Sequence, residues 1–380
     1  MDNVQSDNTS SILDRVLSQK QTQEIEHFNP VEVVTTLLKS LPTREEDILR
    51  RRHALNGEDA QTLEMIGAYY KVTRERVRQI ATGAIGKLRK LHGVHELLQP
   101  VADAITTVLD QHGGVMREEM FLQQLLGVND THAGYRACTL FLMEFLLADR
   151  CKRFQENPSY WPAWQSVTAP VHLVADTITE AVRILEARQT PIKLQELLQE
   201  IGKTAFAQEH RFQLTDNAIS AYIDVSTVLA RNPYDEYGLV AWGSIVPKRM
   251  NDKIHLVLQK AKKPLHFNEI TRLINEAKFD HRTAYAPTVH NELILNKEYV
   301  LIGRGIYALQ EWGFQPGVVA DILVTTLQKA GRPMRRDELV QEVLKQRVVK
   351  RNTIHLALTN RSKFTKLPTG EYTLANVPSA

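Results

Sequence analysis

Four polar side chains within six consecutive positions are the residues whose types and spacing could do chemistry: Arg74, Glu75, Arg78 and Gln79. In a helix they lie together near its N-terminal end, on the face that an apolar stripe leaves exposed. Arg and Gln can each make two hydrogen bonds to a base edge in the major groove of DNA. The chemistry that these residue types favour is therefore the recognition of DNA bases.

Two helices and a tight turn must position these side chains. An amphipathic helix is expected over 62–70, a break over 71–73, and a second helix from Arg74 onward. Thr73 can cap the second helix, although Arg76 stands where a complete capping box has Glu or Gln. The apolar stripe of the second helix is Val77, Ile80, Ala84 and Leu88. This pattern predicts a helix-turn-helix, whose second helix enters the major groove by its N-terminal end.

Residues 41–90 resemble the C-terminal region of primary bacterial sigma factors, which reads the −35 promoter element. The resemblance rests on Leu41-Pro42, on Thr62-Leu63-Glu64 and above all on the run from Val72 to Ile80. It implies that double-stranded DNA is read by Arg74, Glu75 and Gln79. The phosphate contacts that it implies are Thr73, Arg76, Arg78 and Lys87. It also implies the RNA polymerase core as a partner, with the helix over 43–52 docking on the flap of the β subunit.

The segment departs from that family at two places. His53-Ala54 stand where the family usually has an aromatic residue and a glycine, and Gly83 and Gly86 stand where it usually has charged helix formers. Each helix glycine costs about 1 kcal/mol relative to alanine and removes a candidate phosphate contact. We therefore expect the same fold with weaker or altered DNA affinity. Nothing else in the chain resembles another sigma region, so a complete sigma factor is not expected.

Charge is unevenly distributed along the chain, although the formal net charge is only +3. Residues 101–250 carry a net charge of −5, and residues 316–380 carry one of +6. Because acidic surface repels the DNA backbone, phosphate binding is expected outside the acidic middle. No signal peptide, membrane-spanning stretch or lipidation motif is evident, which predicts a cytoplasmic protein without membrane contact. The polar residues 1–29 are expected to form a mobile tail.

An internal repeat occupies the chain behind the helix-turn-helix. Leu109, Leu185, Leu258 and Leu327 anchor four copies that share an ungapped apolar spacing. Each copy is expected to contain three helices and a small β-hairpin, and the pattern resembles HARE-type winged-helix modules. The predicted fold class is mainly α, with a sigma-type helix-turn-helix followed by tandem winged-helix modules. The expected domains are the helix-turn-helix over 30–95 and the repeats over 101–166, 172–247, 250–313 and 316–376.

The basic fourth copy is expected to make a second DNA contact, against the alternative that its charges only favour solubility. The residues proposed for this contact are Lys350, Arg351, Asn352, Arg361 and Lys363. The first two copies are acidic, which favours protein contact or spacing. Winged helices bind DNA and proteins alike, so the expected fold alone does not decide between these roles.

No motif in the sequence carries catalysis. A phosphate-binding GxxxxGK[ST] loop, a GxGxxG motif after a strand, HExxH and CxxC are all absent. We expect no enzyme, no cofactor, no metal and no small-molecule substrate. The leading hypothesis is a sequence-specific DNA-binding transcription factor that acts with RNA polymerase. The alternatives are a delta-like accessory subunit of RNA polymerase with protein-binding winged helices, and a non-catalytic recognition subunit of a restriction or defence system.

Overall fold

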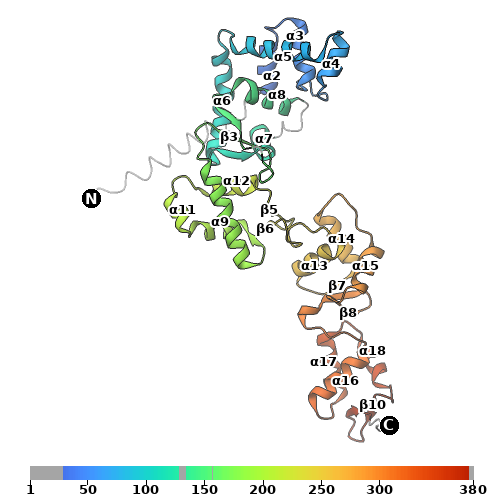
Figure 1. The fold of residues 1–380 in the computed structure, drawn as a ribbon. Coiled ribbons are helices and arrows are strands. Elements are labelled where there is room, and N and C mark those ends of the chain that lie inside the picture. Colours follow the sequence, from blue (N-terminus) through green and yellow to red (C-terminus); the bar gives the residue numbers. More distant parts are fainter. Residues whose placement is uncertain (1–28, 128–133, 156, 376–380) are drawn as a thin grey trace, which may run out of the picture. The chain divides into compact units, whose positions relative to one another are not determined.

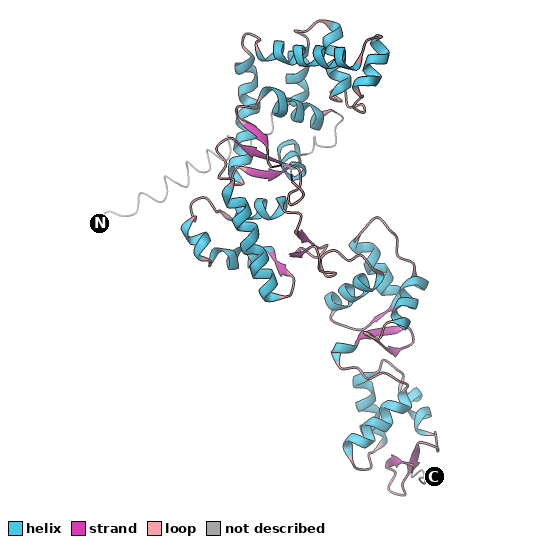
Figure 2. Cartoon of the chain, in the orientation of Figure 1, coloured by secondary structure: helices cyan, strands magenta, loops and turns pink. Residues whose placement is uncertain are grey.

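The computed structural model describes residues 29–127, 134–155 and 157–375, and the expected tail over 1–29 lies outside them apart from Asn29. The described chain is mainly helical with small antiparallel sheets (Figure 2), which confirms the predicted fold class. It divides into two compact units, which are described separately. The first contains the described residues up to Ala230 together with Tyr237–Leu239, and the second contains Arg231–Glu236 and the residues from Val240 onward.

In the described part of the first unit, the four helices that come first form the helix-turn-helix domain (Figure 1). They are α2 (Pro30–Leu38), α3 (Thr43–Arg52), α4 (Leu63–Tyr70) and α5 (Arg74–Arg89). The side-chain oxygens of Asn29, Thr62 and Thr73 accept hydrogen bonds from backbone N–H groups in the first turns of α2, α4 and α5. Such caps satisfy donors that the helix leaves unpaired. The predicted cap by Thr73 is confirmed.

The turn between α4 and α5 is tight because two residues permit a close approach. Lys71 ends α4 in the left-handed region with φ 54°. A Cβ on Gly67 would lie 2.7 Å from the carbonyl oxygen of Val72, closer than such atoms approach in proteins. Gly67 therefore allows the turn to fold back on α4, which fixes the angle between the two helices of the motif.

One order of elements recurs in the rest of the described chain, namely a helix, a short strand, two main helices and a hairpin, with the short strand reduced to a single bridge in the fourth copy. The first copy consists of α6 (Val94–Gln111), β1 (Val115–Arg117), α7 (Glu118–Leu126), α8 (Tyr135–Phe141), β2 (Cys151–Arg153) and β3 (Ala163–Ser166). Its α8 continues into a π-helical segment, Leu142–Leu146. The strand order is β1-β3-β2, so the last strand lies in the centre of the sheet.

The second copy has the same order of elements. It consists of α9 (His172–Arg188), β4 (Ile192–Lys193), α10 (Leu194–Gly202), the short α11 (Ala205–Glu209), α12 (Asp216–Val225), β5 (Leu229–Arg231) and β6 (Glu236–Leu239). Its strand order, β4-β6-β5, repeats that of the first copy. The division between the two compact units falls within this hairpin, inside the segment 172–247 that was predicted as one domain.

The second unit contains the third and fourth copies. The third consists of α13 (Met250–Ala261), β7 (Leu265–His266), α14 (Phe267–Ala277), α15 (Ala286–Leu295), β8 (Tyr299–Gly303) and β9 (Ile306–Leu309), followed by the 3-10 turn Gln310–Trp312. The fourth consists of α16 (Val319–Ala330), α17 (Arg336–Gln346), α18 (Arg351–Leu358), β10 (Phe364–Lys366) and β11 (Tyr372–Leu374). The third sheet has the order β7-β9-β8. In the fourth, a single bridge between Met334 and Tyr372 stands in place of the first strand.

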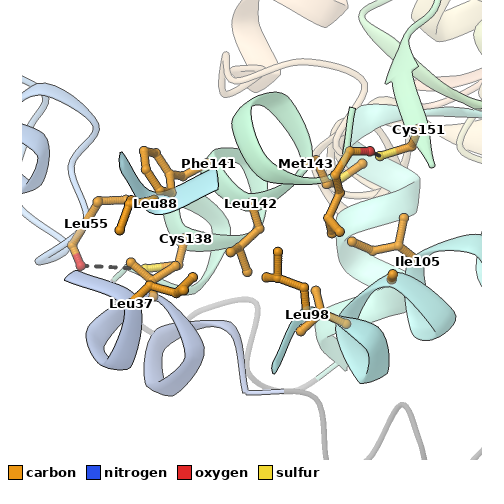
Figure 3. Close-up of a cluster of buried hydrophobic side chains, with 14 of the residues drawn as sticks. Leu37, Leu55, Leu88, Leu98, Ile105, Cys138, Phe141, Leu142, Met143 and Cys151 are labelled. Atoms are coloured by element: carbon orange, nitrogen blue, oxygen red, sulfur yellow. Dashed lines mark hydrogen bonds between the residues drawn. The ribbon is translucent and has the colours of Figure 1, made fainter. Parts of the chain in front are cut away.

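One apolar core joins the helix-turn-helix domain to the first copy. Helix α6 runs without interruption through the boundary that the sequence predicted between residues 95 and 101. Buried side chains from both predicted domains form a single cluster, which runs from Val34 to Trp164 along the chain and also includes Ala221. In Figure 3, Leu37, Leu55 and Leu88 lie around Cys138, Phe141 and Leu142. Because these side chains leave water together, the two parts are expected to fold as one body.

Candidate nucleic-acid interface

The N-terminal end of α5 carries the residues predicted to read DNA, and all of them are exposed. The buried face of the helix is formed by Val77, Ala81, Ala84, Ile85 and Leu88. The predicted stripe is therefore largely confirmed, except that Ile80 is only partly buried. The face opposite that stripe is free of packing at Arg74, Glu75 and Gln79.

The carboxylate of Glu75 organises the polar side chains at this end of α5. The Nε and Nη2 atoms of Arg78 donate to its two oxygens at 2.9 and 2.7 Å. Gln79 Nε2 donates to the same carboxylate at 3.3 Å, and Arg76 Nη1 donates to Gln79 Oε1 at 3.4 Å. The hydrogen bonds from Arg78 hold the pKa of Glu75 below its usual range, so the carboxylate stays charged. Exposed pairs of this kind contribute little to stability, because water screens them, so DNA can displace them.

Two further cations are paired with acids from other helices. Arg74 Nη1 lies 3.0 Å from Glu64 Oε1 on α4, and both side chains are largely exposed. Lys87, predicted to contact phosphate, places Nζ 2.5 Å from Glu45 Oε1 on α3. The second oxygen of Glu45 is buried without a hydrogen-bond partner among the described residues. A phosphate at Lys87 must therefore compete with a carboxylate that is already in place.

An aromatic and ionic network links α3 to α4. The hydroxyl of Tyr70 donates to Asp47 Oδ2 at 2.5 Å, and Arg51 Nε donates to the same oxygen at 2.6 Å. The guanidinium of Arg51 lies 4.4 Å from the ring centre of Tyr69, and that of Arg44 lies 5.0 Å from the ring centre of Tyr70. Burial and the Asp47 carboxylate raise the pKa of Tyr70 to about 12. These residues hold the first helix of the motif in place.

Sequence reasoning missed this network, although part of its signal is present. Asp47 and Arg51 stand four residues apart, the spacing at which opposite charges meet on a helix face. The pairing of Tyr70 with Asp47 spans 23 residues and has no local signature. The partial burial of Asp47 opposes its ionisation, but the hydrogen bonds from Arg51 and Tyr70 outweigh burial and keep its pKa below the usual range.

The first repeat packs against the side of the domain formed by the end of α3 and the end of α5. The ring of His53 lies 5.2 Å from that of Phe141 and 4.9 Å from that of Phe145. Arg89 Nε donates to the carbonyl of Phe145 at 2.6 Å. Burial lowers the pKa of His53 to about 4, so the imidazole is neutral near pH 7. The histidine that departs from the sigma pattern therefore acts as an aromatic packing residue.

Ala54 and the two helix glycines are the other departures from the sigma pattern, and the structure shows the backbone or the space around each. Ala54 adopts φ 58°, the left-handed region that favours glycine, which accounts for the glycine usual at this place in the family. The glycines Gly83 and Gly86 lie inside α5, and a Cβ on either would meet nothing within 4 Å. Packing therefore does not require a glycine at either position.

The second predicted contact lies around α18 in the second unit. Lys350 is the N-cap of this helix, and Arg351, Asn352 and Arg361 are exposed. Lys363 is partly buried and its Nζ lies 2.9 Å from Asp321 Oδ1. The structure thus brings Lys350, Arg351 and Asn352 together at the start of one helix. It places Lys363 beside a carboxylate instead.

The residues that the structure describes contain neither a metal-binding cluster nor a membrane-spanning helix. Within 29–127, 134–155 and 157–375, no group of three or more His, Cys, Asp or Glu side chains is placed to hold a metal ion. None of the helices in these ranges is both long enough and apolar enough to cross a membrane. The thiols of Cys138 and Cys151 are buried, and burial raises the pKa of each to about 12.

Comparison with known proteins bears on the helix-turn-helix domain. Residues 37–90 match the family model described as Sigma-70, region 4. The chain is 51% identical over 53 residues to the RNA polymerase sigma factor SigA of Nostoc sp., which is 14% of either chain. It is 45% identical over 64 residues to the chloroplastic RNA polymerase sigma factor sigD of Arabidopsis thaliana, covering 17% of this chain and 15% of that protein. SigA of Lactococcus lactis subsp. cremoris is 47% identical over 58 residues, which are 15% of this chain and 16% of that protein.

These matches define the class of the first domain. Residues 37–90 form a DNA-binding helix-turn-helix related to that of RNA polymerase sigma factors. The predicted resemblance of this segment is confirmed. The chain spans 14% to 16% of the length of these three relatives. The resemblance of residues 101–376 to HARE-type winged helices stays a prediction.

Proposed function

We propose that this protein is a sequence-specific DNA-binding transcription factor that uses the N-terminal end of α5 in the major groove. The observation that carries the proposal is the exposed group of Arg74, Glu75 and Gln79 on a capped helix that matches sigma region 4. Arg74 offers paired donors to base edges, and Gln79 offers a donor and an acceptor. Glu75 holds Arg78 and Gln79 ready in the absence of DNA.

The proposed mechanism is positioning, with no catalytic step. Arg76, Arg78 and Lys87, with Thr73 beside them, bind phosphates and fix the register of α5 on the duplex. The N-terminal side chains of α5 then select the sequence. Because the acids that pair with Lys87 and Arg78 lie within hydrogen-bond distance, part of the binding energy is spent on separating them. We therefore expect lower affinity than in a domain whose cations are unpaired.

RNA polymerase is the proposed protein partner, since the relatives of residues 37–90 are RNA polymerase sigma factors by name. Helix α3 is the proposed docking element. Its apolar residues Ile48 and Leu49 are buried in the domain, so its available side chains are polar. Arg44 is exposed, and Arg50 and Arg51 are paired with Glu46 and Asp47. A docking surface on α3 would therefore be polar in character.

For the four repeats we propose tandem winged-helix modules, because three copies have a strand between the first two helices and a sheet whose last strand is central, and a single bridge stands in place of that strand in the fourth. The fourth module would bind the DNA backbone through Lys350, Arg351, Asn352 and Arg361. The second candidate function is a polymerase accessory subunit in which the modules bind protein. The acidic charge of residues 101–250 favours protein contact for the first two modules.

A salt series of duplex binding by the full chain separates these two functions. The transcription-factor proposal predicts binding without polymerase, with a steep fall of the association constant as salt rises. Each phosphate contact contributes about 0.9 to the slope of log K against log salt. Binding that appears only after polymerase core is added would support the accessory subunit and overturn the factor.

A further inference from the structure

Arg347 in the fourth module is a buried cation that the DNA contact proposed above does not use. Its side chain is only 4% exposed. Its guanidinium donates to the carbonyl of Leu301 in β8 at 3.1 Å and to those of Gln315 and Gly317 in the connecting segment at 2.5 and 2.7 Å. All three acceptors lie outside the helices of the fourth module. Arg347 therefore ties the segment before α18 to the third module.

The backbone makes a second tie at the same place. Val348 N donates to the carbonyl of Ile302 at 2.9 Å, so this segment pairs with the edge strand β8. A Cβ on Gly303 would lie only 2.8 Å from the carbonyl oxygen of Val348. The end of β8 thus packs directly on the residues that lead into α18. Two hydrogen bonds to β8, two more to the connecting segment and a close backbone approach are expected to hold the third hairpin and α18 in a fixed relation.

This tie joins two segments that carry three cations between them. Arg304 follows Gly303 at the tip of the β8-β9 hairpin and is exposed. Lys350 and Arg351 follow Val348 by two and three residues and are also exposed. Within the ranges that the structure describes, none of the three makes an ion pair or a side-chain hydrogen bond. Three uncompensated cations on two fixed elements raise the local positive potential.

We propose that the β8-β9 hairpin of the third module and the start of α18 form one phosphate-binding surface for duplex DNA, in which Arg304 is a contact beside Lys350 and Arg351. This inference rests on the proposed DNA contact of the fourth module and extends it across the module boundary. A polyanion suits the surface better than a protein, because its three cations lack acidic partners. The apolar part is limited to Leu301 and Val348, each about half exposed.

The test uses the full chain, a duplex of random sequence and the slope of log K against log salt. Arg304→Gln should lower the magnitude of the slope by about one unit, and Lys350→Gln with Arg351→Gln should lower it by about two. Lys297→Gln is the matched control. Lys297 is an exposed cation of the same module that precedes β8, whereas Arg304 follows it, and the five-residue strand between them spans about 16 Å at 3.3 Å per residue. Its substitution should leave the slope unchanged.

A second variant tests the fixed relation without changing charge. Gly303→Ala adds a methyl group against the carbonyl of Val348 and should separate the hairpin from α18. In that background Arg304→Gln should change the slope by much less than one unit. A full one-unit effect in both backgrounds would show that Arg304 acts alone and would overturn the joint surface.

The outcomes also separate this inference from the function on which it rests. If Arg304→Gln left the slope unchanged while Lys350→Gln with Arg351→Gln lowered it, the joint surface would be wrong. The fourth-module contact would still stand. The reverse pattern would also overturn the joint surface, because the hairpin would then bind without α18. If both changes were silent while Arg78→Ala lowered the slope, the contact of the fourth module would be wrong. If Arg78→Ala were silent too, the DNA-binding proposal itself would fail.

Discussion

The carboxylate of Glu75 holds the guanidinium of Arg78 through two hydrogen bonds of 2.9 and 2.7 Å, one turn apart on the exposed face of α5. Gln79 donates to the same carboxylate at 3.3 Å. The candidate phosphate contact and two candidate base readers are therefore linked before DNA arrives. A change at one of them is expected to move the others, so their energies should not add independently.

Base reading and phosphate binding should respond differently to truncation. Arg74→Ala or Gln79→Ala should each cost about 1–3 kcal/mol on the preferred site and relax the preference at one position. Arg78→Ala should weaken binding to all sequences and lower the slope of log K against log salt by about one unit. Titration of each variant against preferred and random duplexes measures both effects. Identical behaviour of the three variants on both duplexes would show that the assignment of base readers is wrong.

The pairing of Lys87 with Glu45 should restrain DNA binding. Glu45→Gln removes the acid that lies 2.5 Å from Lys87 Nζ, and so it should free the ammonium for phosphate. We expect tighter binding and a slope that steepens by up to about one unit. Lys87→Gln is the matched change on the other side of the pair and should weaken binding. If Glu45→Gln left affinity and slope unchanged, Lys87 would not be a phosphate contact.

The helix glycines offer a gain of both stability and affinity. Gly86 lies inside α5 with nothing within 4 Å of an added Cβ. Gly86→Arg should therefore raise the free energy of unfolding by roughly 0.5–1 kcal/mol, because arginine favours helix over glycine. It should also tighten DNA binding by adding a cation to the helix. Denaturant unfolding and duplex titration check the two parts, and lower affinity in a more stable protein would mean that DNA approaches the helix too closely for a side chain.

His53 should make stability fall as the solution becomes mildly acidic. Burial lowers its pKa to about 4 from an ordinary value of 6.5, so the unfolded chain binds the proton more readily. The neutral ring therefore contributes stability that is fully present above pH 6.5 and is lost as the pH falls towards 4. The loss from this group between pH 7.5 and 5 should be about 2 kcal/mol.

His53→Phe isolates that contribution, because phenylalanine can pack against Phe141 and Phe145 and does not titrate. Denaturant unfolding at several pH values should show a flatter pH dependence for this variant between pH 4 and 6.5. An unchanged pH dependence would mean that His53 is not the group that titrates on unfolding.

Local patterns in the sequence were enough to predict the helix-turn-helix. The cap by Thr73 and the buried positions of Val77, Ala84 and Leu88 follow from side-chain chemistry within one or two turns. The mainly helical fold with small sheets also followed from such patterns. Strands such as Ile192–Lys193 and Leu265–His266 are two residues long. They are too short to show the alternation of apolar and polar residues by which a strand is predicted.

The remaining features depend on contacts between distant residues. Lys87 meets Glu45 across 42 positions, and Arg89 meets Phe145 across 56. A count of charges along the sequence also cannot distinguish buried cations from exposed ones. Arg347 is buried against backbone carbonyls, whereas Arg351 of the same basic segment is exposed. The core shared by the helix-turn-helix domain and the first repeat was missed for the same reason, since Phe141 and Phe145 have no local signal of their distant partner His53.

Selection of bound fragments from a random pool of duplex DNA tests the central claim most directly. The full chain is predicted to enrich a short motif, and the chain with Arg74→Ala and Gln79→Ala should lose that motif while still binding DNA in a salt-dependent way. Lys297→Gln should enrich the same motif as the unaltered chain. Enrichment of no motif by the full chain, or of the same motif by the doubly substituted chain, would contradict base reading by the N-terminal end of α5.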